Sequence, residues 1–162
     1  MEIAAVPGCR VHELPPPAAL ASVIARRGRI ADATAIAALG ANGIAFLSSG
    51  PGHWLALSES HATEALATIF GDTASVCDQT GSRVRFEVAG ARSRELLGKG
   101  VGVDLHPTRF AVGQVAVTSI AHMGAMLWRV DAAPTFHLLV PRSYAESFRS
   151  WLRTAAASLG EE

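Results

Sequence analysis

The side chains best suited to chemistry in this sequence are six histidines and two cysteines. The histidines are His12, His53, His61, His106, His122 and His137. No two of them have the HxH or HExxH spacing that would place two metal ligands on one face of a strand or helix. Cys9 and Cys77 are far apart and neither has a CxxC partner, which excludes a zinc ribbon or a dithiol redox motif. We therefore predict no metal site and expect both thiols to be buried or surface residues.

Motifs for nucleophilic catalysis and for nucleotide binding are missing as well. The GxSxG signature of serine hydrolases does not occur, and no local signature accompanies a cysteine and histidine pair. A phosphate loop of the form GxxxxGK[ST] would need Gly at position 93 and Ser or Thr after Lys99, where Ser93 and Gly100 stand. No GxGxxG follows a predicted strand. The sequence therefore predicts neither a hydrolase site nor a dinucleotide site.

Four carboxylates flank predicted elements and could in principle act as general acids or bases. They are Asp78, Glu87, Asp104 and Asp131. Each is better explained as a turn or surface residue. Asp104 lies in a Gly-rich loop just before Leu105, His106 and Pro107, where its carboxylate can order the loop by accepting hydrogen bonds from backbone amides.

Length and composition indicate a globular chain that has a partner. The 162 residues suffice for one domain, and 49% of them are hydrophobic. Fourteen basic and fourteen acidic residues cancel without forming a basic stripe, which argues against nucleic acid as a partner. No apolar run is long enough for a membrane span and residues 1–10 do not look like a leader, so we expect a cytoplasmic protein. Charged residues make up only 17%, and a surface poor in charge favours a protein partner.

The first half of the chain predicts strands and helices in alternation. We expect a strand at 10–14 and, after three prolines, an Ala-rich helix at 18–27. Residues 29–41 fit a loop or a short strand equally well. A Gly- and Pro-rich turn between 44–47 and 54–57 predicts a hairpin. Ser60 can then cap a helix whose apolar face holds Ala62, Leu66, Ile69 and Phe70.

The second half begins with the clearest strand. Val84, Phe86 and Val88 alternate with charged residues, the period-two pattern of a half-buried strand. A short helix at 92–97 follows, and Gly98 stands where a left-handed cap would be needed.

Three further strands and a helix complete the chain. The strands, at 114–121, 126–130 and 136–140, should form an antiparallel meander. The last helix starts with a capping-box pattern at Ser143, and its apolar face is expected to hold Tyr144, Phe148, Trp151 and Leu152.

These elements predict an α+β fold with mixed or antiparallel sheets and packed helices. We expect one domain over residues 1–162, with possible subdomains at about 1–110 and 111–162.

The C-terminal half resembles a known family. The segment from Leu96 through Gly98, Lys99, Asp104, His106 and Pro107 to Phe110 is similar to the gamma subunit of heterotetrameric sarcosine oxidase. The similarity continues, in order and spacing, through Leu127-Trp128-Arg129-Val130, residues 136–140 and the segment from Pro141 to Leu152. In the middle, Gly50-Pro51 and Trp54-Leu55 fit, although Gly52 and His53 replace the family's acidic pair, and Asp78-Gln79-Thr80 precedes Arg83-Val84. The first forty residues contribute little.

A second, more distant likeness concerns the fold. The stretch from Asp78 through Val84, Gly90 and Leu97 to Asp104 is similar to the aminomethyltransferase superfamily, that of the folate-binding glycine-cleavage T-protein. The resemblance implies a reduced aminomethyltransferase-like fold.

The resemblance to the gamma subunit also implies a function. It implies a non-catalytic chain that joins alpha, beta and delta subunits, which oxidise sarcosine to glycine with hydrogen peroxide and formaldehyde or methylene-tetrahydrofolate. The complex would use FAD, FMN, NAD and tetrahydrofolate, none of them bound by this chain. We expect subunit contacts from a set of charged and aromatic residues. They are Lys99, Asp104, His106, Arg109 and Trp128.

Two other interpretations stay open. One is a free-standing folate-binding protein that transfers a one-carbon unit, which would need a concave pterin pocket in this chain alone. The other is a subunit of a related complex that oxidises a different N-methyl amino acid, such as N-methylglutamate, because the substrate pocket would lie in another chain.

Overall fold

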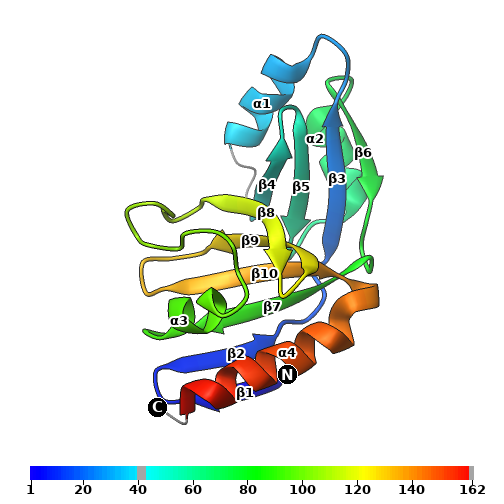
Figure 1. Ribbon diagram of the computed structural model, residues 1–162. Coiled ribbons are helices and arrows are strands. Elements are labelled where there is room, and N and C mark those ends of the chain that lie inside the picture. The colour runs from blue at the N-terminus through cyan, green and yellow to red at the C-terminus, as the bar shows by residue number, and fades with distance from the viewer. Residues whose placement is uncertain (40–42, 161–162) are drawn as a thin grey trace. The chain divides into compact units, whose positions relative to one another are not determined.

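A computed structural model describes residues 1–39 and 43–160, and their contacts divide the chain into two compact units (Figure 1). The first unit is Met1–Pro15 with Arg83–Glu162, and the second is Pro16–Ser82. The predicted subdomain boundary near residue 110 falls inside the first unit, because strands from either side of it pair directly. The fold is α+β with antiparallel sheets and packed helices, as expected.

The first unit is built on a six-stranded antiparallel sheet. Its strands are β1 (Glu2–Val6), β2 (Cys9–Glu13), β7 (Arg83–Ala89), β8 (Val115–Ile120), β9 (Met123–Arg129) and β10 (Thr135–Pro141). Their order across the sheet is β1-β2-β7-β10-β9-β8. The predicted strand around Phe86 and the predicted meander are confirmed as β7 and β8–β10. The strand expected at 10–14 is β2, whereas β1 gave no recognisable pattern.

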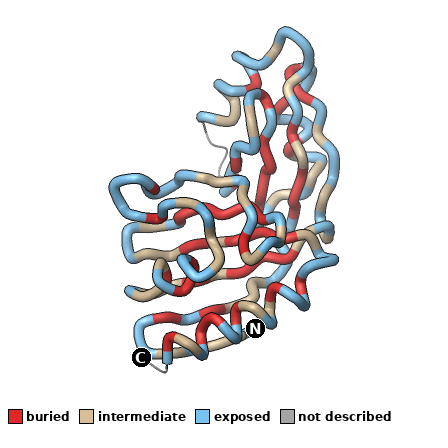
Figure 2. The backbone as a smooth tube through the Cα atoms, in the orientation of Figure 1, coloured by how far each residue is buried: buried red, intermediate tan, exposed pale blue. Residues whose placement is uncertain are grey.

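One face of this sheet carries the core of the first unit. Val84, Phe86 and Val88 of β7 point into it, and helix α4 (Ala145–Gly160) covers it with Phe148 and Leu152. The rings of Phe86 and Phe148 lie 5.1 Å apart, and each fully buried side chain of this size contributes roughly 1.5–3 kcal/mol. Figure 2 shows the buried positions recurring along α4 at helical spacing.

Two details at helix ends differ from the prediction. The chain enters α4 through the 3-10 turn η1 (Arg142–Tyr144), so Ser143 is not the cap of the helix and Tyr144 is exposed rather than on its apolar face. Helix α3 (Ser93–Gly98) includes Gly98, and Lys99 after it keeps a right-handed φ of −69°. The predicted left-handed cap at Gly98 is therefore wrong.

The second unit holds a four-stranded antiparallel sheet and two helices. The strands are β3 (Ala19–Ala25), β4 (Ile44–Gly50), β5 (His53–Ser58) and β6 (Ala74–Asp78), in the order β4-β5-β3-β6. The helices are α1 (Ile30–Leu39) and α2 (Thr63–Phe70). The predicted hairpin is confirmed as β4–β5, and Leu66 and Phe70 of α2 are buried as expected, whereas Ile69 is exposed.

Three local predictions in this unit are wrong. Residues 19–25 are the central strand β3, not part of a helix at 18–27, because Ala19, Ala21 and Val23 bury alternately between two partner strands. The segment expected to be a loop or strand at 29–41 contains α1, and its last two residues lie outside the described ones. The cap of α2 is Ala62, since α2 begins at Thr63 and not directly after Ser60.

In the described parts of the chain, no helix is long and apolar enough to cross a membrane.

Candidate subunit-contact site

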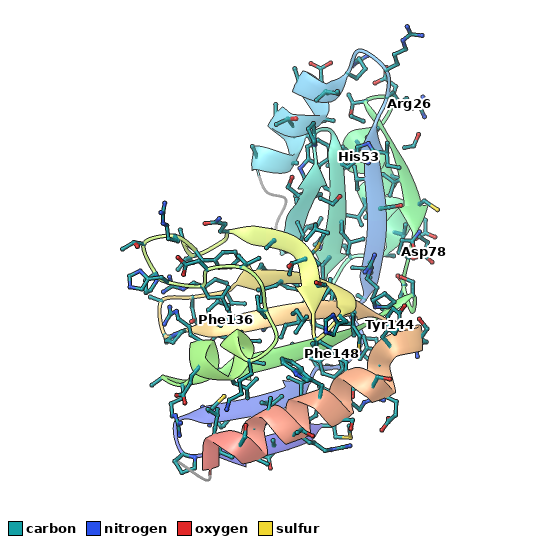
Figure 3. The ribbon with its side chains drawn as sticks, viewed as in Figure 1. Arg26, His53, Asp78, Phe136, Tyr144 and Phe148 are labelled. Carbon is teal, nitrogen blue, oxygen red and sulfur yellow. The ribbon has the colours of Figure 1, made fainter. Side chains whose placement is uncertain are left out.

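Two arginines anchor the loop that follows α3. Leu105 and Phe110 are buried in the core of the first unit. The Leu105 carbonyl accepts a hydrogen bond from Arg94 Nε at 2.9 Å, and the Phe110 carbonyl accepts one from Arg129 Nη1 at 3.1 Å. The Arg94 guanidinium also lies over the ring of Phe136, 5.6 Å from its centre. Phe136 is labelled in Figure 3. The loop is therefore fixed at both ends of the segment 105–110.

Between these anchors the chain forms a compact exposed turn. Asp104 Oδ1 accepts a hydrogen bond from the His106 backbone N–H at 2.9 Å, which confirms the predicted ordering role of this carboxylate. His106 Nδ1 and Thr108 Oγ1 are 2.8 Å apart. The His106 carbonyl accepts hydrogen bonds from the N–H groups of Arg109 and Phe110, both at 2.8 Å. We call residues 104–109 the charged turn, since it carries three of the five predicted contact residues.

The Lys99 side chain contacts α4 and not the charged turn. Its Nζ donates a hydrogen bond to Ser158 Oγ of α4 at 2.8 Å. Next to it, Gly100 lies so close to Trp151 that a Cβ on Gly100 would be 2.6 Å from the indole ring. Lys99 therefore belongs to the packing of the loop against α4 and is not joined to the charged turn by any contact in the described residues.

Trp128 lies in β9, on the sheet face opposite the core. Its neighbours Ala125 and Leu127 point into the core, whereas the Trp128 ring meets the ring of His137 edge-on at 5.3 Å. The side chain is 7% exposed. The structure thus brings Asp104, His106 and Arg109 together, and places Lys99 and Trp128 at separate positions.

The sheet face opposite the core carries a row of side chains that the sequence did not predict. Paired positions on neighbouring strands align Glu2, His12, Glu87, His137 and Trp128, which we call the polar row. The Glu87 carboxylate lies 3.1 Å from His137 Nε2 and 3.7 Å from His12 Nδ1. The alternation of residues along β7 predicts that Glu87 lies on the sheet face opposite the core. Which side chains of the neighbouring strands lie beside Glu87 follows only from the strand register.

Three further ionisable groups of the first unit, Arg129, Arg94 and Cys9, are at least partly buried. Arg129 is buried and donates to the carbonyls of Phe110, Asp131 and Ala132. Burial lowers the pKa of Arg94, and the positive charge of Arg129 lowers it further. Burial also raises the pKa of the Cys9 thiol to about 11, which leaves it a poor nucleophile.

Each unit has a hollow that is lined by described residues. One of about 480 Å³ is lined by Ala5 to Arg10 and by Ala89 to Ala91, mostly small residues and backbone. The other, in the second unit, lies at the start of α2 beside Asp78 (Figure 3), whose pKa is lowered by hydrogen bonds from Thr80. No group of three histidine, cysteine or acidic residues suited to a metal ion occurs among residues 1–39 and 43–160.

Comparison with known families identifies the chain. The model of the "Sarcosine oxidase, gamma subunit family" matches residues 16–158. The chain belongs to this family. The resemblance noted in the C-terminal half of the sequence therefore extends over the whole of the second unit as well.

Solved structures agree with this assignment at the level of the fold. A chain of the heterotetrameric sarcosine oxidase from Corynebacterium sp. U-96, in complex with pyrrole 2-carboxylate, is 23% identical, with a TM-score of 0.84 over 98% of this chain and 89% of that one. The glycine cleavage system aminomethyltransferase T from Bartonella henselae is 14% identical, with a TM-score of 0.60. The match covers 90% of this chain but 45% of the aminomethyltransferase. The fold is thus aminomethyltransferase-like in a reduced form. A comparison with curated proteins found no match in sequence.

Proposed function

We propose that this gamma-family chain is a non-catalytic subunit of a heterotetrameric sarcosine oxidase, assembled with alpha, beta and delta subunits. The observation that carries the proposal is the family match over residues 16–158. The fold likeness to a chain of a heterotetrameric sarcosine oxidase supports it. A charged fraction of 17% is also suited to a chain that buries surface against partners.

The proposed complex oxidises sarcosine to glycine, with hydrogen peroxide and formaldehyde or methylene-tetrahydrofolate as the other products. FAD, FMN, NAD and tetrahydrofolate are bound by the other subunits in this proposal. We propose the cytoplasm as its location.

The charged turn is one part of this chain that is suited to meet a partner. Its backbone is held by the hydrogen bonds of Asp104 and His106, so little conformational entropy is lost when it is bound. It presents the exposed side chains of Asp104 and Arg109, five positions apart in the sequence, and charges of both signs give specificity to a contact.

A substitution at His106 tests this contact. We expect His106→Ala to loosen the turn and to lower the yield of complex in a pull-down through this chain, while His53→Ala, an exposed histidine of the second unit (Figure 3), serves as the matched control. Trp128→Ala is expected to lower the yield too, but it also removes the ring contact with His137, so its melting temperature must be measured alongside. Unchanged yield with both variants would remove these residues from the contact.

The proposed function itself is tested by co-expression. The tagged chain is co-expressed with candidate alpha, beta and delta subunits from the same genome, purified through its tag, and examined for a flavin spectrum and for sarcosine-dependent peroxide formation. Yellow, active protein is the expected result. A colourless single chain, with its candidate partners present but unbound, would contradict the proposal and would favour a free-standing folate-related protein. Activity with another N-methyl amino acid but not with sarcosine would reassign the substrate.

A further inference from the structure

Strand β8 is an unprotected sheet edge. The described residues form four edge strands, β1 and β8 in one sheet and β4 and β6 in the other. Natural edges are usually blunted by charges, proline or a β-bulge. Each of the other three edge strands has such a feature. Strand β1 carries Glu2 and has a register shift, β4 has a register shift between Ser48 and Gly50, and β6 ends in the charged residue Asp78. Strand β8, with the sequence VAVTSI, has no charge or proline and pairs with β9 in unbroken register.

The hydrogen bonds of β8 show which backbone groups point away from the sheet. Arg129 N–H donates to the Gln114 carbonyl at 3.2 Å, which fixes the phase of the ladder between β8 and β9. In an antiparallel pair, every second residue turns its N–H and C=O away from the partner strand. Val115, Val117 and Ser119 are therefore the residues of β8 whose backbone groups face outward, and Ser119 lies at the end of the strand that Val101 approaches. The Val117 side chain is 62% exposed, on the face opposite the core.

The chain itself shows how this edge accepts a partner. Val101, just after α3, forms an isolated antiparallel bridge with Ile120 at the end of β8, and the Ala121 N–H donates to the Gly100 carbonyl at 3.0 Å. Beyond Val101 the loop turns away, because Leu105 is buried in the core and held by Arg94. One end of the edge is thus paired by a short segment, and the stretch around Val117 is left open.

We infer that β8 pairs with an extended segment of a partner subunit, which adds a seventh strand to the sheet of the first unit. The inference rests on the proposed function, since it names the mode of contact within that complex. The segment that fits runs antiparallel to β8, carries no charge opposite Val117, and has apolar side chains on the face of Val115 and Val117. Backbone hydrogen bonds supply the affinity of such strand addition, and the alternate side chains supply its specificity.

Amide hydrogen exchange provides the direct test. The full chain purified alone is compared with the purified complex, and exchange is followed by mass spectrometry of overlapping peptides over residues 113–121. The amides of Val115 and Val117 should exchange quickly in the free chain and at least about 100-fold more slowly in the complex. The amide of Ala116, which faces β9, should be protected in both samples and serves as the internal reference.

Two edge variants provide the second test. Val117→Pro removes the outward N–H at a position where an edge strand tolerates proline. Val117→Lys keeps the N–H and places a charge on the edge, so it remains informative if the proline variant does not fold. Each should lower the affinity for the partner at least about tenfold. Val112→Lys, at a valine 51% exposed in the loop before β8, is the matched control and should leave the affinity unchanged.

The outcomes separate this inference from the proposed function. An intact complex whose Val115 and Val117 amides exchange as fast as in the free chain would overturn the inference and leave the proposed function in place. A free chain that dimerises, and that Val117→Pro renders monomeric without weakening the complex, would assign the edge to a second copy and also overturn it. Failure of any complex to form would overturn both.

Discussion

Arg149 of α4 donates two hydrogen bonds to the carboxylate of Glu13 in β2, from Nε at 2.6 Å and from Nη2 at 3.0 Å. The two residues are 136 positions apart, so this fork joins the two ends of the chain within the first unit. Both side chains are about four-fifths buried, which reduces the screening by solvent. Bidentate charge-assisted pairs are the strongest of the ion pairs found in proteins.

Glu13→Gln tests the strength of this fork. We expect the free energy of unfolding at neutral pH to fall by about 1 kcal/mol, measured by urea denaturation, because the neutral amide accepts a weaker hydrogen bond. Glu146→Gln is the matched control, since the Glu146 carboxylate also accepts from Arg149 but is 78% exposed. An equal loss in the two variants would contradict the special role of Glu13.

The same fork predicts a pH dependence. The hydrogen bond from Arg149 lowers the pKa of Glu13 in the folded chain below its ordinary value. The stabilisation is therefore fully present above the ordinary glutamate pKa and is lost as the pH falls through the lowered, folded value. The wild type and Glu13→Gln should converge in unfolding free energy on acidification. A difference that stays constant down to the acid transition would contradict this assignment.

The two thiols should differ in reactivity. Cys77 is exposed, whereas Cys9 is buried and its pKa is raised to about 11 by burial. One thiol per chain should therefore react rapidly with a disulfide reagent at neutral pH, and the second only after denaturation. A Cys77→Ser variant should show no rapid phase. Two rapid phases in the native wild type would contradict the burial of Cys9.

Gly90 should not tolerate a side chain. Its φ is +114°, and a Cβ there would collide with the backbone carbonyl of Gly8. We expect Gly90→Ala to cost at least about 2 kcal/mol in urea denaturation, because neither backbone can yield without breaking the bond from Arg92 N–H to the Gly8 carbonyl. Gly98→Ala is the control: open space surrounds Gly98 within α3, so alanine should raise stability by up to about 1 kcal/mol.

The turn between β8 and β9 should be open to stabilisation. Ala121 and His122 both have positive φ, 48° and 66°, the conformation of a two-residue turn that favours Asn-Gly. Replacing the pair by Asn-Gly should raise the unfolding free energy by about 1 kcal/mol. A lower stability would indicate that the His122 side chain makes a contribution to folding that outweighs the backbone strain.

The sequence predicted helices and strands best where a single hydrophobic period dominates the segment. Strand β7 and the buried residues Phe148 and Leu152 of α4 follow patterns of two and of about 3.6 residues that no other signal disturbs. Strand β3 was mistaken for a helix because alanine favours helices, and only pairing on both sides with β5 and β6 overrides that preference. The weak pattern of α1 predicted a loop or a short strand instead of a helix for a comparable reason, since its small residues form no clear apolar face.

The candidate site was predicted in part. The charged turn and the ordering role of Asp104 follow from local chemistry, because an Asp two residues before an amide can bond to it in isolation. The polar row and the outward phase of β8 depend on strand register, which joins residues as distant as His12, Glu87 and His137. Register is set by tertiary pairing, so these features became visible only in the structure.

Native mass spectrometry of the complex tests the central claim most directly. The chain is co-expressed with the candidate partner subunits, and the tag is placed on a flavin-binding subunit. We expect this 16.9 kDa chain to be retained by the flavoprotein subunits and to be released as an intact polypeptide when the assembly is activated in the gas phase. A complete, active flavoprotein assembly that never contains the chain, although the chain is expressed and folded in the same cells, would contradict its role as a subunit.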